Sequence, residues 1–429
     1  MGWQSRFFRD CAELIRDTVQ PGEMPGLPYI GLEHISQGQL SLLGYGKSED
    51  VVSAKFKFRK GDILFGKLRP YFRKVVIAPF DGVCSTDIWV VRARDGIDQR
   101  YLFYWMASED FIEAVSRASE GTKMPRAQWE FAERIQQQIP PLPEQRAIAA
   151  VLGALDDEIQ AKGGESKGMR RILNHLINRL VSGAWSVEEG KAWLATARRL
   201  IEPLDDKIEL NRRMNRTLEA MAQAVFREMM KDVEKEGSIL EFADLLSGGT
   251  PSTAEESYWN GDIEWVSAKD VSSADGVFLL DTEKKITQAG IDHSSTKLLP
   301  AKTTIVTARG TVGAHCMLGK PMTMNQTNYG LKAKEGIGDY FVYFALSEMV
   351  EQLKQQSYGT IFDTITTKTF HSVLCPRPSL GVIQQFEERV TPLMDAILNN
   401  LKQSRTLAAL RDALLPKLLR GEVRVTVHE

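Results

Sequence analysis

The chain carries one helical pattern twice, as LDDEIQAKGGESKGMRRILNHLINRLVSG at residues 155–183 and as LMDAILNNLKQSRTLAALRDALLPKLLRG at residues 393–421. In an ungapped alignment the two copies share seven positions, in the same order and with the same apolar spacing. The shared positions are Leu155, Asp157, Ile159, Ser166, Leu176, Leu180 and Gly183 in the first copy and Leu393, Asp395, Ile397, Ser404, Leu414, Leu418 and Gly421 in the second. Because chance matches would not keep this order, the pattern indicates an internal repeat.

The segments upstream of both copies repeat as well. Tyr29-Ile30 corresponds to Trp265-Val266, Gly61–Leu64 to Lys302–Val306, Tyr101 and Tyr104 to Tyr340 and Tyr343, Ser108-Glu109 to Ser347-Glu348, and Gly121-Thr122 to Gly359-Thr360. We therefore predict an α+β chain with two similar mixed α/β domains, related as a pseudo-two-fold repeat and separated by long antiparallel coiled-coil helices.

Short apolar runs between Gly, Pro and Asp predict the strands of both domains. They are Val51–Phe58, Ile63–Phe65, Val75–Ala78 and Ile88–Val91, then Ile263–Val266, Thr304–Thr307 and Tyr329–Leu331. Helical stretches are predicted at Arg100–Ser119 and Asp339–Gln356. Since proline cannot continue a ladder, the Pro-rich runs at 139–143 and 375–378 predict the domain exits. The predicted parts are residues 1–143, 144–236, 237–380 and 381–429, in the order domain, helices, domain, helices.

The helical parts carry a coiled-coil spacing with a polar level in the middle. The stripes include Leu204, Ile208, Asn211, Asn215 and Leu218 in the central part and Leu393, Ile397, Asn400, Leu407 and Leu414 in the C-terminal part; Leu155 occupies the matching place in the first copy. A buried Asn layer fixes the register of a helix pair at some cost in stability. We expect the two stripes to pack as an antiparallel pair, so that a rod of about 43 Å holds the two domains apart.

One central segment does not fit a simple repeat. The pattern Leu-x-Asp-x-Ile occurs at Leu155, Leu204 and Leu393, and the first two lie close together in the chain. The run Gly163–Gly168 breaks the first helix, and 169–181 is helical again. The sequence therefore predicts either an extra helical hairpin or a tandem duplication at about residues 161–202.

Composition narrows the class of protein. The chain has 429 residues, 26% of them charged, and a formal net charge of −2. It has no apolar run long enough to span a membrane, no secretory leader and four scattered cysteines, which predict a cytoplasmic protein. The signatures of enzymes are not matched. The loop Gly44–Ser48 has Ser41 where a phosphate-binding loop needs glycine. Asp275 with Glu283–Lys285 loosely resembles a nuclease arrangement of carboxylates and lysine, but no second carboxylate site supports metal chemistry there.

Local charge points to nucleic acid despite the balanced total. Residues 55–74 hold eight basic residues and one acid, interleaved with aromatic residues, and residues 293–334 hold no Asp or Glu. A solvated sheet face would explain one such patch, but the patches occupy equivalent places in both repeats. Basic stripes with aromatic and amide neighbours are typical of nucleic-acid binding, because Arg can contact guanine edges or phosphates and Asn or Gln adenine edges.

At this point the sequence resembles a known family. The run Gly61–Tyr71 with Cys84–Asp87, and the run Ser247–Ser252 with Tyr258–Val266, resemble the target-recognition domains of DNA specificity subunits from type I restriction–modification systems. Leu142–Arg146, the helix at 204–226 and Leu414–Leu418 resemble that family's helical regions. The resemblance covers nearly the whole chain in the expected order, apart from the extra central segment.

The resemblance implies a non-catalytic subunit. Each recognition domain would read one half of a split target in double-stranded DNA, with the helices setting the spacer. Two modification subunits that bind S-adenosylmethionine would dock on the helices, and restriction subunits with ATP-dependent translocase and nuclease activity would join them. This chain would then hold no cofactor; S-adenosylmethionine, ATP and Mg²⁺ would belong to the partners. The alternative from another class is a self-contained methyltransferase or nuclease with an unrecognised catalytic motif.

The candidate DNA-binding residues follow from the basic patches and the family-like motifs. They are Lys55, Lys57, Lys67, Arg69, Tyr71, Arg73, Lys74, Ser85, Thr86 and Lys123 in the first domain, and Lys269, Arg309, Thr311, Asn325, Gln326, Thr327 and Thr360 in the second. No catalytic, cofactor-binding or metal-binding residue is predicted in this chain, and no membrane partner.

Overall fold

The computed structural model describes residues 2–117, 124–163, 166–356 and 364–422. The chain forms two compact units, Met1–Asp206 with Ala408–Glu429, and Lys207–Leu407. The boundary between them falls inside the two long helices α6 (Val187–Met230) and α11 (Leu380–Leu419). Each unit has its own hydrophobic clusters.

The strands of the first unit form two larger sheets and a two-stranded ribbon. They are β1 (Gln4–Phe7), β2 (Ala12–Ile15), β3 (Thr18–Val19), β4 (Pro28–Ile30), β5 (Gly46–Lys47), β6 (Lys55–Phe58), β7 (Ile63–Gly66), β8 (Val75–Ile77), β9 (Gly82–Cys84), β10 (Ile88–Ala93) and β11 (Gln136–Ile139). The sheet orders are β2-β10-β7-β8, β3-β6-β9-β4-β5 and β1-β11. All pairings are antiparallel except that of β4 with β9.

The four-stranded sheet is buried on both faces, which explains its short, continuously apolar strands. Ile63 and Phe65 belong to the cluster formed with the helices, whereas Leu64 between them belongs to the cluster with Phe58 and Cys84 of the other sheet. Successive side chains of a strand point to opposite faces, so a strand between two layers needs apolar residues at every position. This sheet therefore forms the centre of the first domain.

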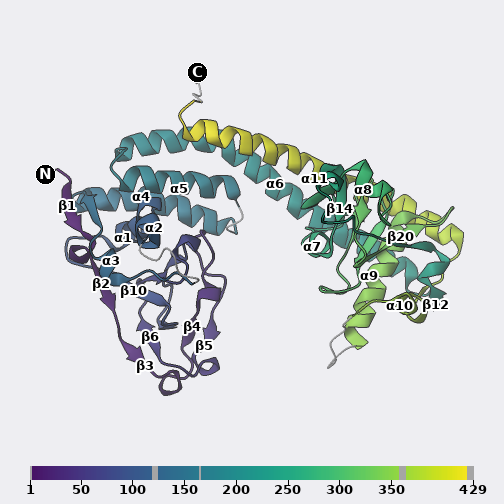
Figure 1. Ribbon diagram of the computed structural model, residues 1–429, viewed down its shortest axis with the longest axis horizontal. Coiled ribbons are helices and arrows are strands. Elements are labelled where there is room, and N and C mark those ends of the chain that lie inside the picture. Colours follow the sequence, from purple (N-terminus) through teal and green to yellow (C-terminus); the bar gives the residue numbers. More distant parts are fainter. Residues whose placement is uncertain (1, 118–123, 164–165, 357–363, 423–429) are drawn as a thin grey trace. The chain divides into compact units, whose positions relative to one another are not determined.

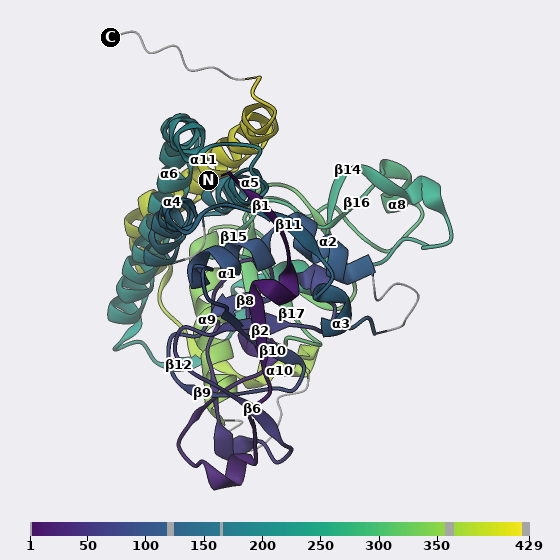
Figure 2. The same cartoon turned by 90° about the vertical axis from the view of Figure 1, so that its left-hand side faces the viewer.

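The second unit repeats this plan. Its strands are β12 (Lys235–Ser238), β13 (Ala243–Ser247), β14 (Trp259–Val266), β15 (Phe278–Leu279), β16 (Lys284–Ile286), β17 (Thr304–Thr307), β18 (His315–Leu318), β19 (Thr323–Met324), β20 (Asn328–Ala333) and β21 (Leu374–Pro376). The sheet orders are β13-β20-β17-β18-β15, β16-β14-β19 and β12-β21. Its shorter helices are α7 (Ala268–Ser272), α8 (Gln288–Asp292), α9 (Asp339–Gln356) and α10 (Thr367–Ser372). Figure 2 shows β14, β16 and α8 projecting from the rest of this unit.

The predicted pseudo-repeat is confirmed by strand order and register. The run β2-β10-β7 of the first unit corresponds to β13-β20-β17 of the second. The parallel pairing of Ile30 with Cys84 corresponds to that of Val266 with Met324. The α+β fold with two similar domains therefore agrees with the sequence prediction.

Two local predictions differ from the structure in detail. The helical stretch expected at Arg100–Ser119 is present as two helices, α1 (Gln99–Ala107) and α2 (Glu109–Arg117), followed by α3 (Trp129–Ala132); residues 118 and 119 lie outside the described residues. The break falls at Ser108, which leaves the helical conformation and whose Oγ accepts a hydrogen bond from the Phe111 amide at 3.4 Å. Serine competes with helix continuation in this way. The strand expected at Val51–Phe58 is confined to β6.

The extra central segment is a helical hairpin, as one of the two predicted alternatives proposed. It comprises α5 (Lys167–Val181) and the start of α6, and it follows α4 (Leu142–Ala161) (Figure 1). Gly163 ends the first helix with a φ of 83°, a left-handed conformation that favours glycine. The helix α5 folds back on α4 and also contacts α1. In the second copy the matching segment is continuous within α11.

The helices α6 and α11 pair antiparallel through the predicted polar layer. Asn211 is fully buried, and its Nδ2 donates to the Asn400 carbonyl at 3.3 Å and to Ser404 Oγ at 3.1 Å. Asn400 Nδ2 donates to Asn215 Oδ1 at 2.9 Å. These bonds specify one register, because a shifted pairing would leave buried amides without partners.

The apolar stripe is buried to different degrees. Ile397 and Leu155 are buried, whereas Leu204, Ile208, Leu218, Leu393, Leu407 and Leu414 are half-buried. The fully buried side chains of these helices in the second unit include Phe226, Phe386 and Met394, which share a cluster with α9. Each long helix therefore packs on a domain as well as on the other helix. For this reason the most buried residues of each helix differ in part from the predicted stripe.

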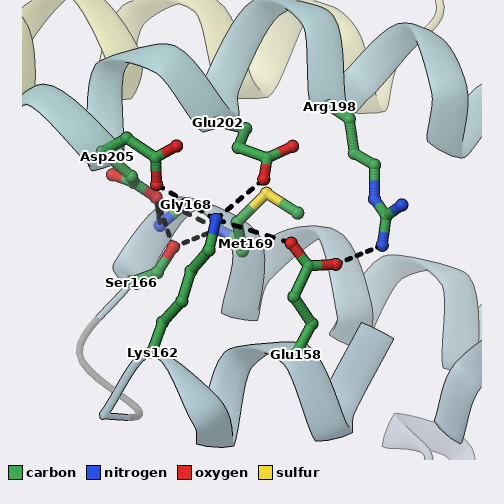
Figure 3. A network of polar contacts seen from close by, with 9 residues as sticks. Glu158, Lys162, Ser166, Gly168, Met169, Arg198, Glu202 and Asp205 are labelled. Carbon is green, nitrogen blue, oxygen red and sulfur yellow. Dashed lines mark hydrogen bonds and ion pairs between the residues drawn. The ribbon is translucent and has the colours of Figure 1, made fainter. Parts of the chain in front are cut away.

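A polar network joins the hairpin to α6 (Figure 3), and a buried ion pair extends it to the end of α11. Asp205 Oδ2 accepts hydrogen bonds from Ser166 Oγ at 2.6 Å and from the amides of Gly168 and Met169 at 3.0 and 3.3 Å. Its Oδ1 accepts from Arg411 Nη1 at 2.8 Å. Asp205 thus caps the first turn of α5 while forming an ion pair with α11. Both side chains are buried, at 6% and 8% exposure.

Two further contacts show how closely these helices approach. A Cβ on Gly168 would lie 2.5 Å from Ile201 and 2.9 Å from Arg411, so only glycine fits this crossing. Lys162 Nζ lies 2.8 Å from Glu202 and 3.1 Å from Asp206, which ties the end of α4 to α6 (Figure 3). The fold-back of α5 is therefore held by specific contacts on three helices.

The start of α9 is capped differently from that of α1. In the first unit Asp98 caps its own helix, accepting from the Arg100 and Tyr101 amides at 3.0 and 2.9 Å. In the second unit Glu387 of α11 accepts from the Phe341 amide of α9 at 2.7 Å. Burial raises the pKa of Glu387 to about 7, with Asp339 adding to the increase. This carboxyl therefore titrates near neutral pH.

We expect Glu387→Gln to remove a pH dependence of stability. A carboxyl with a raised pKa in the folded state stabilises the protein at low pH and loses that contribution between pH 4.5 and about 7. Glutamine keeps the acceptor for the Phe341 amide but cannot ionise. The variant should gain about 2 kcal/mol over the parent at pH 8 and little at pH 4.5, after allowing for partial exposure. Urea unfolding of both proteins across this range measures the difference, and a constant difference would contradict the assignment.

Candidate nucleic-acid interface

Each domain presents one turn, between its parallel strand pair and its central sheet, built on the same hydrogen bonds. In the first domain the Ser85 amide donates to the Ile30 carbonyl at 2.9 Å, and the Asp87 amide to Ser85 Oγ at 3.2 Å. In the second domain the Asn325 amide donates to Val266 at 2.9 Å, and the Thr327 amide to Asn325 Oδ1 at 3.1 Å. Short polar side chains are favoured here because they bond the backbone two residues ahead. Residues 85–87 and 325–327 are therefore equivalent, and we call them the first and second turns.

A short segment from elsewhere in the chain lies against each turn. In the first domain the Lys67 amide donates to the Asp87 main-chain carbonyl at 2.9 Å. The Ala127 amide donates to the Lys67 carbonyl, and the Arg69 amide to the Pro125 carbonyl, both at 2.8 Å. In the second domain the Ala308 amide donates to Thr327 at 2.9 Å and the Ile365 amide to Ala308 at 3.0 Å. The backbone therefore brings together side chains from three separate parts of each domain.

The first turn is surrounded by basic side chains. Lys67 is half-buried, and Arg69, Thr86 and Arg126 are exposed. Neither the Lys67 ammonium nor the Arg69 guanidinium has a hydrogen-bond or ion-pair partner among residues that the structure describes, and Arg69 lies 5.8 Å from the Phe72 ring. Cations without internal hydrogen-bond or ion-pair partners suit contacts to phosphate.

The second turn is surrounded by amides and hydroxyls. Gln326 is exposed, and its Oε1 accepts a hydrogen bond from Thr250 Oγ1, which leaves Nε2 available. Arg309 and Thr311, which follow β17 in the chain, are exposed as well. Gly248 allows the close approach, since a Cβ there would lie 2.2 Å from the Asn325 carbonyl. The two interfaces therefore share a backbone frame but differ in chemistry.

Several predicted contact residues are occupied within the protein. Lys55 is 5% exposed, and its Nζ donates to the Ser53 carbonyl and hydroxyl at 2.7 and 2.6 Å. Arg73 Nε donates to the Ala107 carbonyl at 2.6 Å, and Lys74 Nζ to the Leu32 carbonyl at 2.5 Å. Burial lowers the pKa values of Lys55 and Arg73. In the arrangement described these three side chains stabilise the domain, so the proposed contact surface does not include them.

The other predicted residues lie at varied distances from the turns. Lys57 is half-buried on β6, and Tyr71 is 52% exposed next to Phe72. Lys269 on α7 is exposed and lies 2.6 Å from Glu283, which raises its pKa. Lys123 and Thr360 lie outside the described residues.

Sequence reasoning missed Arg126, Thr250 and Thr364. Arg126 forms a bridge with Leu68, and its Nε lies 3.1 Å from Asp87 Oδ1. Thr364 is exposed, and its Oγ1 donates to the Ala308 carbonyl at 3.0 Å. For Arg126 and Thr364 the available signal was their place shortly after the repeated Gly-Thr pairs, which the alignment of the two copies marks as equivalent, and for Thr250 it was the Ser247–Ser252 run.

Other kinds of site find little support. Burial raises the pKa of the Cys84 and Cys316 thiols, which keeps them protonated and unreactive. Among the described residues no group of three or more His, Cys, Asp or Glu is placed to hold a metal ion. Within the same part of the chain no helix is long and apolar enough to cross a membrane.

Comparison with known proteins identifies the family. The family model of the type I restriction modification DNA specificity domain matches residues 3–167 and 230–404. The specificity subunit of the type I restriction enzyme HindI from Haemophilus influenzae is 24% identical over 410 residues, which cover 86% of this chain and 88% of the relative. The EcoDI specificity subunit of Escherichia coli is 30% identical over 198 residues, 45% of this chain and 44% of the relative. A solved type I restriction–modification S subunit from M. genitalium aligns over 99% of this chain and 97% of its own, with 16% identity and a TM-score of 0.45.

The chain belongs to the type I restriction–modification DNA specificity family, because the family model matches one copy of its domain in each half of the chain. Its function is recognition of a DNA target, and its place in such a system is that of the non-catalytic specificity subunit. These comparisons confirm the predicted family and function, and they give no support to a self-contained methyltransferase or nuclease.

Proposed function

We propose that each domain reads one half of a two-part DNA target through its turn. The observation that carries this proposal is the shared backbone frame of residues 85–87 and 325–327, which presents different side chains in the two domains. Base readout needs side chains with distinct donor and acceptor patterns, whereas phosphate contacts only position the protein. Two similar frames with different side chains suit two different half-sites.

The first domain offers cations and the second offers amides. Lys67 and Arg69 beside the first turn would neutralise phosphates, and Arg309 would do so in the second domain. Gln326 would pair with an adenine edge, donating from Nε2 and accepting at the lone pair of Oε1 that Thr250 does not use. Asn325, whose Oδ1 accepts from the Thr327 amide and hydroxyl, would offer its Nδ2 as a donor. Lys57, Tyr71, Ser85, Thr86, Lys269, Thr311 and Thr327 complete the proposed contact set.

Membership of the family supports a proposal for the partner subunits. The complex would contain two modification subunits, which bind S-adenosylmethionine and dock on the helical regions, and restriction subunits that use ATP and Mg²⁺. The exposed Leu210, Met214 and Met221 on α6 give the helices apolar surface for such docking. We propose a cytoplasmic location, which the DNA target and the pattern of scattered cysteines support.

Mapping methylated bases in cells with and without this gene tests the proposal. The parent should produce one motif with two defined halves and a fixed spacer, which disappears without the gene. Loss of the gene without any change in methylation would count against the proposal. Methylation or cleavage by the purified chain alone would count against its non-catalytic role.

We expect Gln326→Ala to relax only the second half of the motif. Losing a bidentate amide contact costs about 1–3 kcal/mol of discrimination, or roughly 10- to 100-fold at one base pair. Sequencing of methylated sites from the variant complex measures both halves in one experiment. The matched control is Gln288→Ala, an exposed amide on α8 that bonds Asp292 within its own helix. A change in the first half would contradict the assignment of this turn to the second.

A further inference from the structure

An acidic side chain stands among the cations of the first turn. Asp87 is 30% exposed and lies 3.1 Å from Arg126 Nε, while Lys67 and Arg69 are held by backbone bonds in the same place. A carboxylate repels phosphate, so it weakens simple electrostatic binding at this spot. The pair also contributes little to stability, because exposed ion pairs are worth about 0–1 kcal/mol. Neither nonspecific attraction of DNA nor the stability of the fold explains why Asp87 lies here.

The geometry of the pair leaves the outer edge of the guanidinium open. Asp87 engages Nε, and no other described residue bonds the two terminal Nη groups, with the Arg126 side chain 51% exposed. The backbone at Arg126 is itself fixed by the Ala127 and Arg69 bonds. A guanidinium held at Nε and open at both Nη groups is prepared for a two-pronged contact, since less side-chain freedom is lost on binding.

The second domain has no such pair at the equivalent places. The hydrogen-bond frame aligns Asp87 with Thr327 and Ala127 with Ile365, so Thr364 stands where Arg126 stands. Both replacements are uncharged hydroxyl residues. The acid–base pair is therefore a chemical difference between two otherwise similar frames, at the point where the halves of a target would be distinguished.

We propose that Arg126 is a specificity-determining residue for the first half of the target and that it contacts the major-groove edge of a guanine. Asp87 is its positioning residue. The inference rests on the proposed two-part function. Guanine presents two acceptors, N7 and O6, that match the paired donors of a guanidinium. A carboxylate that holds Nε fixes the plane in which those donors lie.

Methylated-site sequencing of Arg126 variants tests the assignment. Arg126→Ala should lower the preference for guanine at one position of the first half by about 10- to 100-fold and leave the second half unchanged. Arg126→Lys keeps the charge but not the paired donors, so it should retain affinity and lose the same preference. The matched control is Arg117→Ala, which removes another exposed arginine paired with a carboxylate, Glu113, in the same domain.

The positioning role of Asp87 has its own readout. Asp87→Asn should weaken the preference at the same position only, and should add no further loss when Arg126 is already alanine. An unchanged motif in both Arg126 variants would overturn the inference, as would a loss of affinity that is equal for all sequences. If the parent itself shows no two-part motif, the proposed function fails rather than this assignment.

Discussion

Replacing Asp205 with alanine is expected to destabilise the first unit by about 3 kcal/mol, because Arg411 stays buried and keeps only the half-exposed Asp412 carboxylate, 3.1 Å from its Nε, as a counter-charge. The same change removes the acceptor for Ser166 Oγ and for the Gly168 and Met169 amides at the start of α5. Buried donors without partners carry the full cost of their desolvation. Urea unfolding should show an earlier transition, and hydrogen exchange should show faster opening of the α5 amides.

The neighbouring residue Asp206 provides the control. It lies on the same helix and pairs with Lys162 at 3.1 Å, but its side chain is 56% exposed. Asp206→Ala should therefore cost less than about 1 kcal/mol. Equal effects of the two substitutions would mean that the buried ion pair does not hold the hairpin to α11.

The sequence predicted the fold because its signals are local and repeated. The ordered match of the two helical segments marks the domain duplication, and the apolar runs mark strands that are buried on both faces. The Asn211 and Asn400 layer could be predicted because buried amides in a helix stripe need each other. The hairpin could be expected from Gly163, although the sequence left a tandem duplication open.

The site was less predictable because the direction in which a basic side chain points depends on backbone segments that are distant in the sequence. Arg73 and Arg69 are close in sequence and both have a positive φ, yet only Arg73 reaches the Ala107 carbonyl. Lys55 turns inward to Ser53, although its neighbours on the strand gave the same basic pattern. Arg126 lies far from the basic run in sequence, and the backbone bonds of its neighbours Ala127 and Pro125 to Lys67 and Arg69 bring it there. The charge pattern of the sequence therefore predicted where the proposed DNA-contacting surface lies, but not which side chains belong to it.

The arrangement separates attraction from discrimination within the first domain. Lys67 and Arg69 have no internal partners among the described residues, which suits contacts that follow charge alone. Arg126 is held by a carboxylate, which suits a contact with a fixed direction. Removal of Lys67 and Arg69 should therefore weaken binding to every DNA sequence, whereas removal of Arg126 should change the base preference at one position of the target.

The double variant Lys67→Ala with Arg69→Ala should lower DNA affinity by about 100-fold at low salt, for target and non-target sequences alike. Each lost phosphate contact should also reduce the slope of log affinity against log salt by about 0.9, so the slope should fall by roughly 2. Binding titrations of the assembled complex over a range of salt concentrations measure both effects. Arg216→Ala with Lys402→Ala removes the same charge from exposed positions on α6 and α11 and should change the slope little. If both double variants lose affinity equally, net charge rather than this surface attracts the DNA.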